Sequence, residues 1–138
     1  GVVLDLMIHD LDLILALAGS PVARVEALGA ALLGGHEDLA QARVTFASGC
    51  VADLTACRVS PEGARRMRAW GPEGYVGVDF GTKKVTLMQP GQDRGRLAPA
   101  VPRAGPGSEI GVVHELRGDG RGRLLAEARG RPVDARAA

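Results

Sequence analysis

Residues 40–59 read AQARVTFASGCVADLTACRV, and this stretch decides the fold. Its first part alternates apolar with polar side chains, as a strand does when successive side chains point to opposite faces of a sheet. The apolar series is Ala40, Ala42, Val44 and Phe46. Ser48-Gly49 supplies a turn, and the chain then returns as a second alternating segment. The stretch predicts an antiparallel hairpin with strands at Ala40–Phe46 and Cys50–Val59.

Apolar side chains recur at helical spacing in the N-terminal part and predict a helix from Leu4 to Leu17. The stripe consists of Leu4, Ile8, Leu11 and Leu15, widened by Ile14 and Ala18. Gly19 is the expected C-cap, and Pro21 forbids continuation. Further strands are predicted at Val22–Leu33, Ala64–Trp70, Tyr75–Phe80 and Val85–Met88. We therefore predict an α+β fold, a mostly antiparallel open-faced sheet with the N-terminal helix packed on one face.

Composition divides the chain near Pro90. Residues 91–138 contain 9 Gly and 4 Pro among 48 residues and no aromatic side chain. This share of Gly and Pro is typical of flexible segments. We therefore expect a folded domain at residues 1–90, for substrate binding and oligomerisation, followed by a flexible tail at 91–138. Ile110–Leu116 could add a strand and Arg123–Arg129 a short helix, and neither is counted in the predicted fold.

Charge and hydropathy exclude several classes of function. Lys and Arg number 17 against 16 Asp and Glu, so the chain lacks the basic field that binds nucleic acid. No apolar run approaches the roughly 20 residues of a membrane span. Cys50 and Cys57 lie seven residues apart within one predicted strand, roughly 23 Å at ~3.3 Å per residue, beyond disulfide reach. Free thiols favour a cytoplasmic protein.

Successive residues of a helix are rotated by 100°, so Asp5, His9 and Asp12 share one face of the predicted helix. Asp10 points elsewhere, and we expect it to be solvated. In the simplest interpretation, Asp5 complements the helix dipole and His9 is its i+4 partner. In a second, a carboxylate orients an imidazole that acts as general acid or base. A third interpretation, a metal site, lacks a further ligand cluster, so we expect no metal.

No nucleotide-binding or nucleophile motif is present in the sequence. The segment Gly1-Val2-Val3-Leu4-Asp5-Leu6-Met7-Ile8-His9-Asp10-Leu11-Asp12-Leu13 nevertheless resembles the start of the C-terminal domain of Gfo/Idh/MocA oxidoreductases. The resemblance continues through Gly19-Ser20-Pro21-Val22, Glu37-Asp38 and the hairpin Ala42-x-Val44-x-Phe46-x-Ser48-Gly49. It covers roughly residues 1–90.

The resemblance implies an NAD(P)-dependent dehydrogenase of sugars, whose N-terminal Rossmann domain holds NAD or NADP. By analogy, His9 is the catalytic acid/base for the substrate hydroxyl. Asp5 orients both His9 and that hydroxyl, and Asp12 belongs to the substrate-binding residues. The segments 55–60, 65–68 and 75–79 resemble a branch acting on nucleotide sugars. Arg58 and Arg65 would then bind substrate, because arginines can meet a diphosphate bidentately. Alternatively, the arginines at 65, 66 and 68 form a solvated strand edge.

The chain does not begin with Met, and we expect it to be the later part of a longer polypeptide. It would then be inactive without the cofactor domain and the Glu-Lys-Pro segment of the family. The alternative function is a non-catalytic interaction module. One short helix cannot cover both faces of the sheet. The strand Cys50–Val59 is apolar on both faces, with Val51, Cys57 and Val59 on one and Ala52, Leu54 and Ala56 on the other. We expect whichever face the helix leaves uncovered to pair homo-oligomers.

Overall fold

The computed structural model describes residues 1–72, 74–88 and 106–117. A π-helical turn, η1 (Val3–Met7), leads directly into helix α1 (Ile8–Ala18), and Gly19 ends the helix in the left-handed conformation with φ 54°. Seven strands follow: β1 (Val22–Ala30), β2 (Leu39–Phe46), β3 (Val51–Ser60), β4 (Ala64–Gly71), β5 (Gly74–Asp79), β6 (Lys84–Met88) and β7 (Glu109–Arg117). The helix and all six predicted strands are confirmed, and β1 ends three residues before the predicted Leu33.

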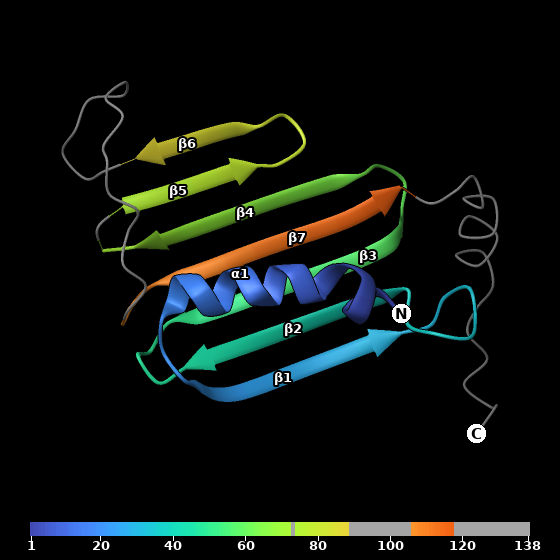
Figure 1. The fold of residues 1–138 in the computed structure, drawn as a ribbon, viewed down its shortest axis with the longest axis horizontal. Helices are drawn as coiled ribbons and strands as arrows, with labels where there is room; N and C mark the ends of the chain where they lie inside the picture. The colour runs from blue at the N-terminus through green and yellow to red at the C-terminus, as the bar shows by residue number, and fades with distance from the viewer. Residues whose placement is uncertain (73, 89–105, 118–138) are drawn as a thin grey trace, which may run out of the picture.

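The strands form one sheet in the order β1-β2-β3-β7-β4-β5-β6 (Figure 1). β3 and β7 are parallel, and all other neighbouring pairs among the described strands are antiparallel. The predicted α+β class, a mostly antiparallel open sheet with an N-terminal helix on one face, is therefore confirmed.

β7 is the central strand of the sheet, although it lies inside the segment 91–138 for which composition predicts a flexible tail. It separates β3 from β4, so the sheet extends beyond the predicted residues 22–88. Glycine and proline content averages over a long window, whereas a strand needs only a short alternation such as Ile110 and Val112, which are both buried. Residues 91–105 and 118–138 of the expected tail, which include Arg123–Arg129, lie outside the described residues.

The core lies between α1 and the face of the sheet on which the helix packs, over β3 and β7 (Figure 1). Phe46 is 1% exposed, and burying such a side chain contributes about 1.5–3 kcal/mol. The principal sheet residues of this core are Ala40, Ala42, Val44, Phe46, Ala52, Leu54, Ala56, Met67, Ile110 and Val112. Among the described residues, no helix is long and apolar enough to span a membrane.

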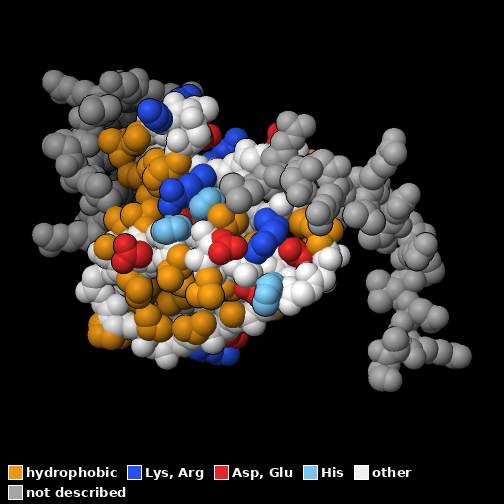
Figure 2. All heavy atoms as spheres, turned by 45° about the vertical axis from the view of Figure 1, so that its right-hand side comes forward, with side chains coloured by type: hydrophobic (Ala, Val, Ile, Leu, Met, Phe, Trp, Pro, Cys, Tyr) orange, Lys and Arg blue, Asp and Glu red, His pale blue; other side chains and the backbone are white. Residues whose placement is uncertain are grey.

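The helix presents a different apolar stripe to the sheet than the sequence predicts. Leu4, Ile8 and Leu15 are exposed, whereas Ile14 and Ala18 are buried. Of these exposed residues, Leu15 borders a groove of about 520 Å³ between α1 and β1. The lining of the groove also includes Val3, Met7, Leu11, Val25 and Leu28. Figure 2 shows hydrophobic side chains gathered on this side of the molecule, next to His, Arg and Lys side chains.

The open face of the sheet is more polar than predicted. Val59 is buried, while Val51 and Cys57 are half-buried. Asp53, which lies between Val51 and Cys57 on the same face, forms an ion pair with Arg43 of the neighbouring strand, with Arg43 Nε 2.8 Å from Asp53 Oδ1. Both cysteines are free thiols, as predicted.

Candidate active site

The side chains of Asp5, His9 and Asp12 are all exposed, so the predicted polar surface of the helix is present. Asp5 lies in the π-helical turn, and His9 and Asp12 lie in α1. Short π-helical segments widen the helical turn and occur often at functional sites. No contact joins Asp5 to His9 in the part of the chain that the structure describes, and Asp5 instead pairs with Arg58.

Asp10 was expected to be solvated, and this prediction is wrong. The residue is 1% exposed and faces the sheet together with Ile14 and Ala18. The three residues are spaced four apart, so they form a buried stripe in which an acidic side chain takes an apolar place. A buried carboxylate requires partners because an unpaired buried charge is strongly destabilising.

The partners of Asp10 come from two strands. The Arg65 guanidinium on β4 donates a hydrogen bond to Asp10 Oδ1 at 3.1 Å, and His114 Nδ1 on β7 lies 3.0 Å from Asp10 Oδ2. Arg65 and His114 stand directly opposite each other in the antiparallel β4–β7 pair. The Arg65 guanidinium also stacks 4.7 Å from the centroid of the Phe80 ring. We call Asp10, Arg65 and His114 the central polar cluster.

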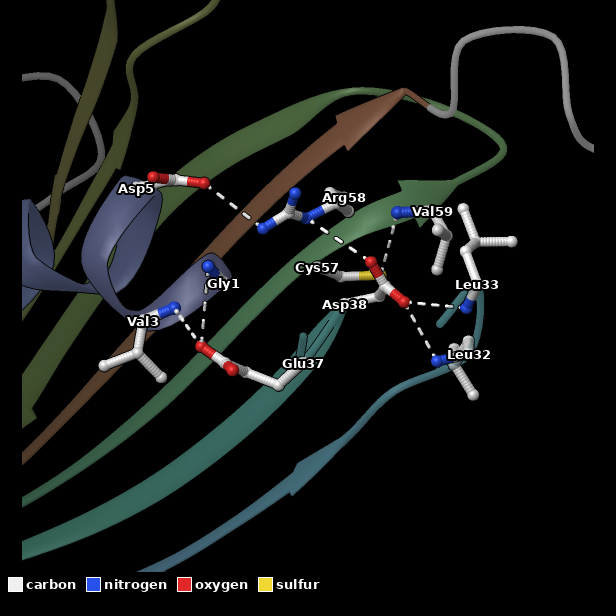
Figure 3. A network of polar contacts seen from close by, with 10 residues as sticks. All are labelled: Gly1, Val3, Asp5, Leu32, Leu33, Glu37, Asp38, Cys57, Arg58 and Val59. Atoms are coloured by element: carbon white, nitrogen blue, oxygen red, sulfur yellow. Dashed lines mark hydrogen bonds and ion pairs between the residues drawn. The ribbon is translucent and has the colours of Figure 1, made fainter. Parts of the chain in front are cut away.

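A second cluster of polar contacts, drawn in Figure 3, connects the start of the helix to the edge of the sheet. Asp38 is 4% exposed, and its Oδ2 accepts hydrogen bonds from the backbone N–H groups of Leu32 and Leu33 at 2.9 and 2.7 Å. Its Oδ1 lies 3.5 Å from Arg58 Nε, while Arg58 Nη2 donates to Asp5 Oδ2 at 3.2 Å. The arginine therefore bridges a buried and an exposed carboxylate.

The environment of Asp38 favours its charged form. The Leu33 N–H lowers the pKa of Asp38 most, the Leu32 N–H and Arg58 lower it further, and burial opposes them. The carboxylate is therefore an anchor that stays ionised at neutral pH, and it holds Arg58 in place beside Asp5.

The structure brings the predicted site residues together only in part. Asp5 and Arg58 are in contact, whereas Arg65 belongs to the central polar cluster. Within the described residues, no hydrogen bond or ion pair involves the side chain of His9 or Asp12. Sequence reasoning missed Asp10 and left Asp38 without a role. It placed His114 in the tail, where a strand at Ile110–Leu116 was considered but not counted. Among the described residues, no group of His, Cys, Asp and Glu side chains could hold a metal ion.

An N-terminal helix on an open sheet, with an exposed Asp-x3-His at the start of the helix, is the arrangement that the family resemblance leads us to expect. Residues 1–77 match the sequence profile of the GFO/IDH/MocA C-terminal domain. The chain belongs to this family.

The chain is similar to UDP-N-acetylglucosamine 3-dehydrogenase of Acidithiobacillus ferrooxidans. It is 48% identical to that protein over 79 residues, which are 57% of this chain and 25% of the relative. Two solved structures of that dehydrogenase superpose with TM-scores of 0.63 and 0.64, at 36% and 34% identity. The two superpositions cover 96% and 95% of this chain. This chain spans 42% and 39% of the length of the two solved chains.

Proposed function

We propose that this chain is the catalytic and substrate-binding half of an NAD(P)-dependent nucleotide-sugar dehydrogenase. The observation that carries the proposal is the 48% identity to UDP-N-acetylglucosamine 3-dehydrogenase over 79 residues. It is supported by the match of residues 1–77, which contain Asp5 and His9, to the GFO/IDH/MocA C-terminal domain. Both side chains are exposed at the N-terminal end of the helix, where a ligand can reach them. The substrate class we assign is a UDP-linked amino sugar, oxidised from alcohol to ketone.

In this reaction the C–H bond of the alcohol carbon breaks as the C=O bond forms. The imidazole of His9 takes the hydroxyl proton, and it is suited to this because histidine changes charge near neutral pH. The nicotinamide supplies the acceptor for the hydride. Asp5 accepts a hydrogen bond from the substrate and orients it toward His9, while Arg58 fixes the Asp5 carboxylate.

The described residues do not fit a dinucleotide on their own. Among them, no glycine-rich loop joins a strand to the N-terminus of a helix, which is the arrangement that cradles a pyrophosphate. We propose that a Rossmann domain supplies this site, as the family resemblance implies, and that the chain alone does not transfer hydride. The choice between NAD and NADP would then lie in that domain.

The remaining predicted site residues take different places in the proposal. Arg65 is the proposed ligand of the substrate diphosphate, and Asp12, exposed on the same helix as His9, is a proposed ligand of a sugar hydroxyl. Arg58 was predicted to bind substrate directly. Because it already spans two carboxylates, we propose that it acts on the substrate through Asp5.

A second candidate function is a non-catalytic interaction module. It is favoured by the open face of the sheet, which no helix covers in the part of the chain that the structure describes. Homo-oligomers paired through this face are compatible with both functions. The free thiols suit a reducing compartment such as the cytoplasm.

A chimera tests the proposal. The Rossmann domain of the Acidithiobacillus relative is joined to residue 1 of this chain, and absorbance of reduced nicotinamide is followed with UDP-N-acetylglucosamine and with free N-acetylglucosamine. The intact relative serves as the positive control. We expect turnover of the UDP-sugar and little turnover of the free sugar. A folded chimera that binds the cofactor and oxidises neither substrate would contradict the catalytic function and favour the interaction module.

A further inference from the structure

We infer that Arg65 and His114, held by the buried carboxylate of Asp10, form a subsite for the pyrophosphate group of a nucleotide ligand. This inference rests on the proposed function for its place in the reaction. It assigns a role to two residues, Asp10 and His114, that the proposed proton transfer does not use.

The central polar cluster has few acceptors for its nitrogen atoms. Arg65 and His114 stand opposite each other on adjacent strands. The described residues within ion-pair distance supply them with one carboxylate, Asp10, which the two side chains share. A phosphate group would give the Arg65 guanidinium a second anionic acceptor.

The hydrogen-bond donors of the cluster are also incompletely used. Arg65 Nε is buried and has no acceptor among the described residues, which is uncommon because buried donors are almost always paired. Arg58 Nε is likewise without a hydrogen bond, but it lies 3.5 Å from Asp38 Oδ1. Among the described residues, Arg65 has no second carboxylate within ion-pair distance. Its planar fork of N–H groups suits a phosphate.

Two members of the cluster are accessible to solvent. The side chain of Arg65 is 36% exposed and that of His114 is 12% exposed, whereas Asp10 beneath them is 2% exposed. His114 uses Nδ1 toward Asp10, so its Nε2 remains to meet a ligand. Phe80 supports the guanidinium from one side.

The subsite adjoins the proposed catalytic residues. Asp10 directly follows His9 in α1, so the buried anchor of the subsite and the exposed imidazole belong to the same turn of the helix. In Figure 1 the helix lies over the middle of the sheet and not over β4, β5 and β6. In the inferred complex, a sugar at His9 extends its pyrophosphate toward Arg65 on β4 and His114 on β7.

Titration of the full chain with inorganic pyrophosphate, followed by ¹⁵N NMR of arginine Nε–Hε groups and by calorimetry, tests the subsite. We expect the Arg65 signal to shift and R65Q to weaken binding about tenfold or more, since it removes charge-assisted hydrogen bonds. H114Q should weaken binding as well. The matched control is R66Q, because Arg66 is also paired with an aspartate, Asp79, but sits on the next residue of β4 and on the opposite face.

Titrations with UDP and with NAD⁺ distinguish the two nucleotide sources of a pyrophosphate. Tighter binding of UDP assigns the subsite to the nucleotide sugar, and tighter binding of NAD⁺ assigns it to the cofactor. If wild type does not bind pyrophosphate at millimolar concentration, or if R65Q and R66Q bind it equally, the inference is overturned. R65K covers the case in which R65Q misfolds, because it keeps the charge, loses the fork and should bind with intermediate affinity.

Failure of the subsite and failure of the proposed function give different results. If the chimera oxidises UDP-N-acetylglucosamine and R65Q leaves its KM unchanged, the subsite is wrong and the dehydrogenase function stands. If pyrophosphate binds at Arg65 and the chimera oxidises no nucleotide sugar, the subsite stands and the dehydrogenase function fails.

Discussion

Replacing Asp38 with alanine should destabilise the domain more than any surface ion pair does. The change removes an acceptor for the Leu32 and Leu33 N–H groups and leaves Arg58 paired with Asp5 alone. Hydrogen bonds to a charged group contribute about 1.5–3 kcal/mol each. Because Leu32 and Leu33 lie in an exposed loop where water can replace the acceptor, we expect a loss of about 2–4 kcal/mol in total.

Urea unfolding at pH 7, followed by circular dichroism, measures this loss as a lower midpoint at unchanged slope. Asp53→Ala is the matched control. Asp53 also accepts two hydrogen bonds, from Arg43, but both side chains are more than half exposed. Exposed pairs contribute about 0–1 kcal/mol. Equal losses for Asp38→Ala and Asp53→Ala would refute the reasoning.

The pH dependence gives the same prediction a second readout. In the folded chain the pKa of Asp38 lies below its usual value of 3.8, so its contribution is complete above that pH and is lost as pH falls through the folded value. The difference in stability between wild type and Asp38→Ala should therefore be constant near neutral pH and narrow below about pH 4. A difference that widens in acid would contradict it.

Two further changes test the packing. Gly71→Ala should lower the free energy of unfolding, measured by thermal unfolding, by about 1–3 kcal/mol, because the added Cβ would lie 2.6 Å from Ser108 Oγ. Gly29→Ala is the control and should lower it less, because its added Cβ meets only ordinary contacts, from 3.5 Å. In the folded chain, an aromatic disulfide reagent should modify one thiol quickly, that of the half-buried Cys57. Cys50 should react slowly, because burial raises the pKa of its thiol. Two thiols that react quickly would contradict the buried position of Cys50.

Local alternation was sufficient to predict six of the seven strands that the structure describes, and β7 was not counted among them. In the segment 40–46, the apolar series is buried on the helix side and the polar series lies on the open face, as the two-residue period of a strand requires. The exposed positions of Asp5, His9 and Asp12 also agree with the helical arrangement inferred from spacing.

The partners of charged residues could not be read from the sequence. Two stripes of α1 have helical spacing, and the more apolar one, with Leu4 and Ile8, is exposed. The buried stripe contains Asp10, whose burial depends on Arg65 and His114, 55 and 104 residues away in the chain. Side-chain periodicity carries no information about such distant partners.

The central claim is that His9 performs the proton transfer of a dehydrogenase, and the most direct measurement is the kcat of the chimera with UDP-N-acetylglucosamine after His9→Gln. Removing a general acid or base lowers kcat by about 10²–10⁴-fold, and we predict a loss in this range with cofactor binding unchanged. His36→Gln, in an exposed loop, is the matched control and should retain wild-type kcat. A His9→Gln chimera that keeps wild-type kcat would contradict the account.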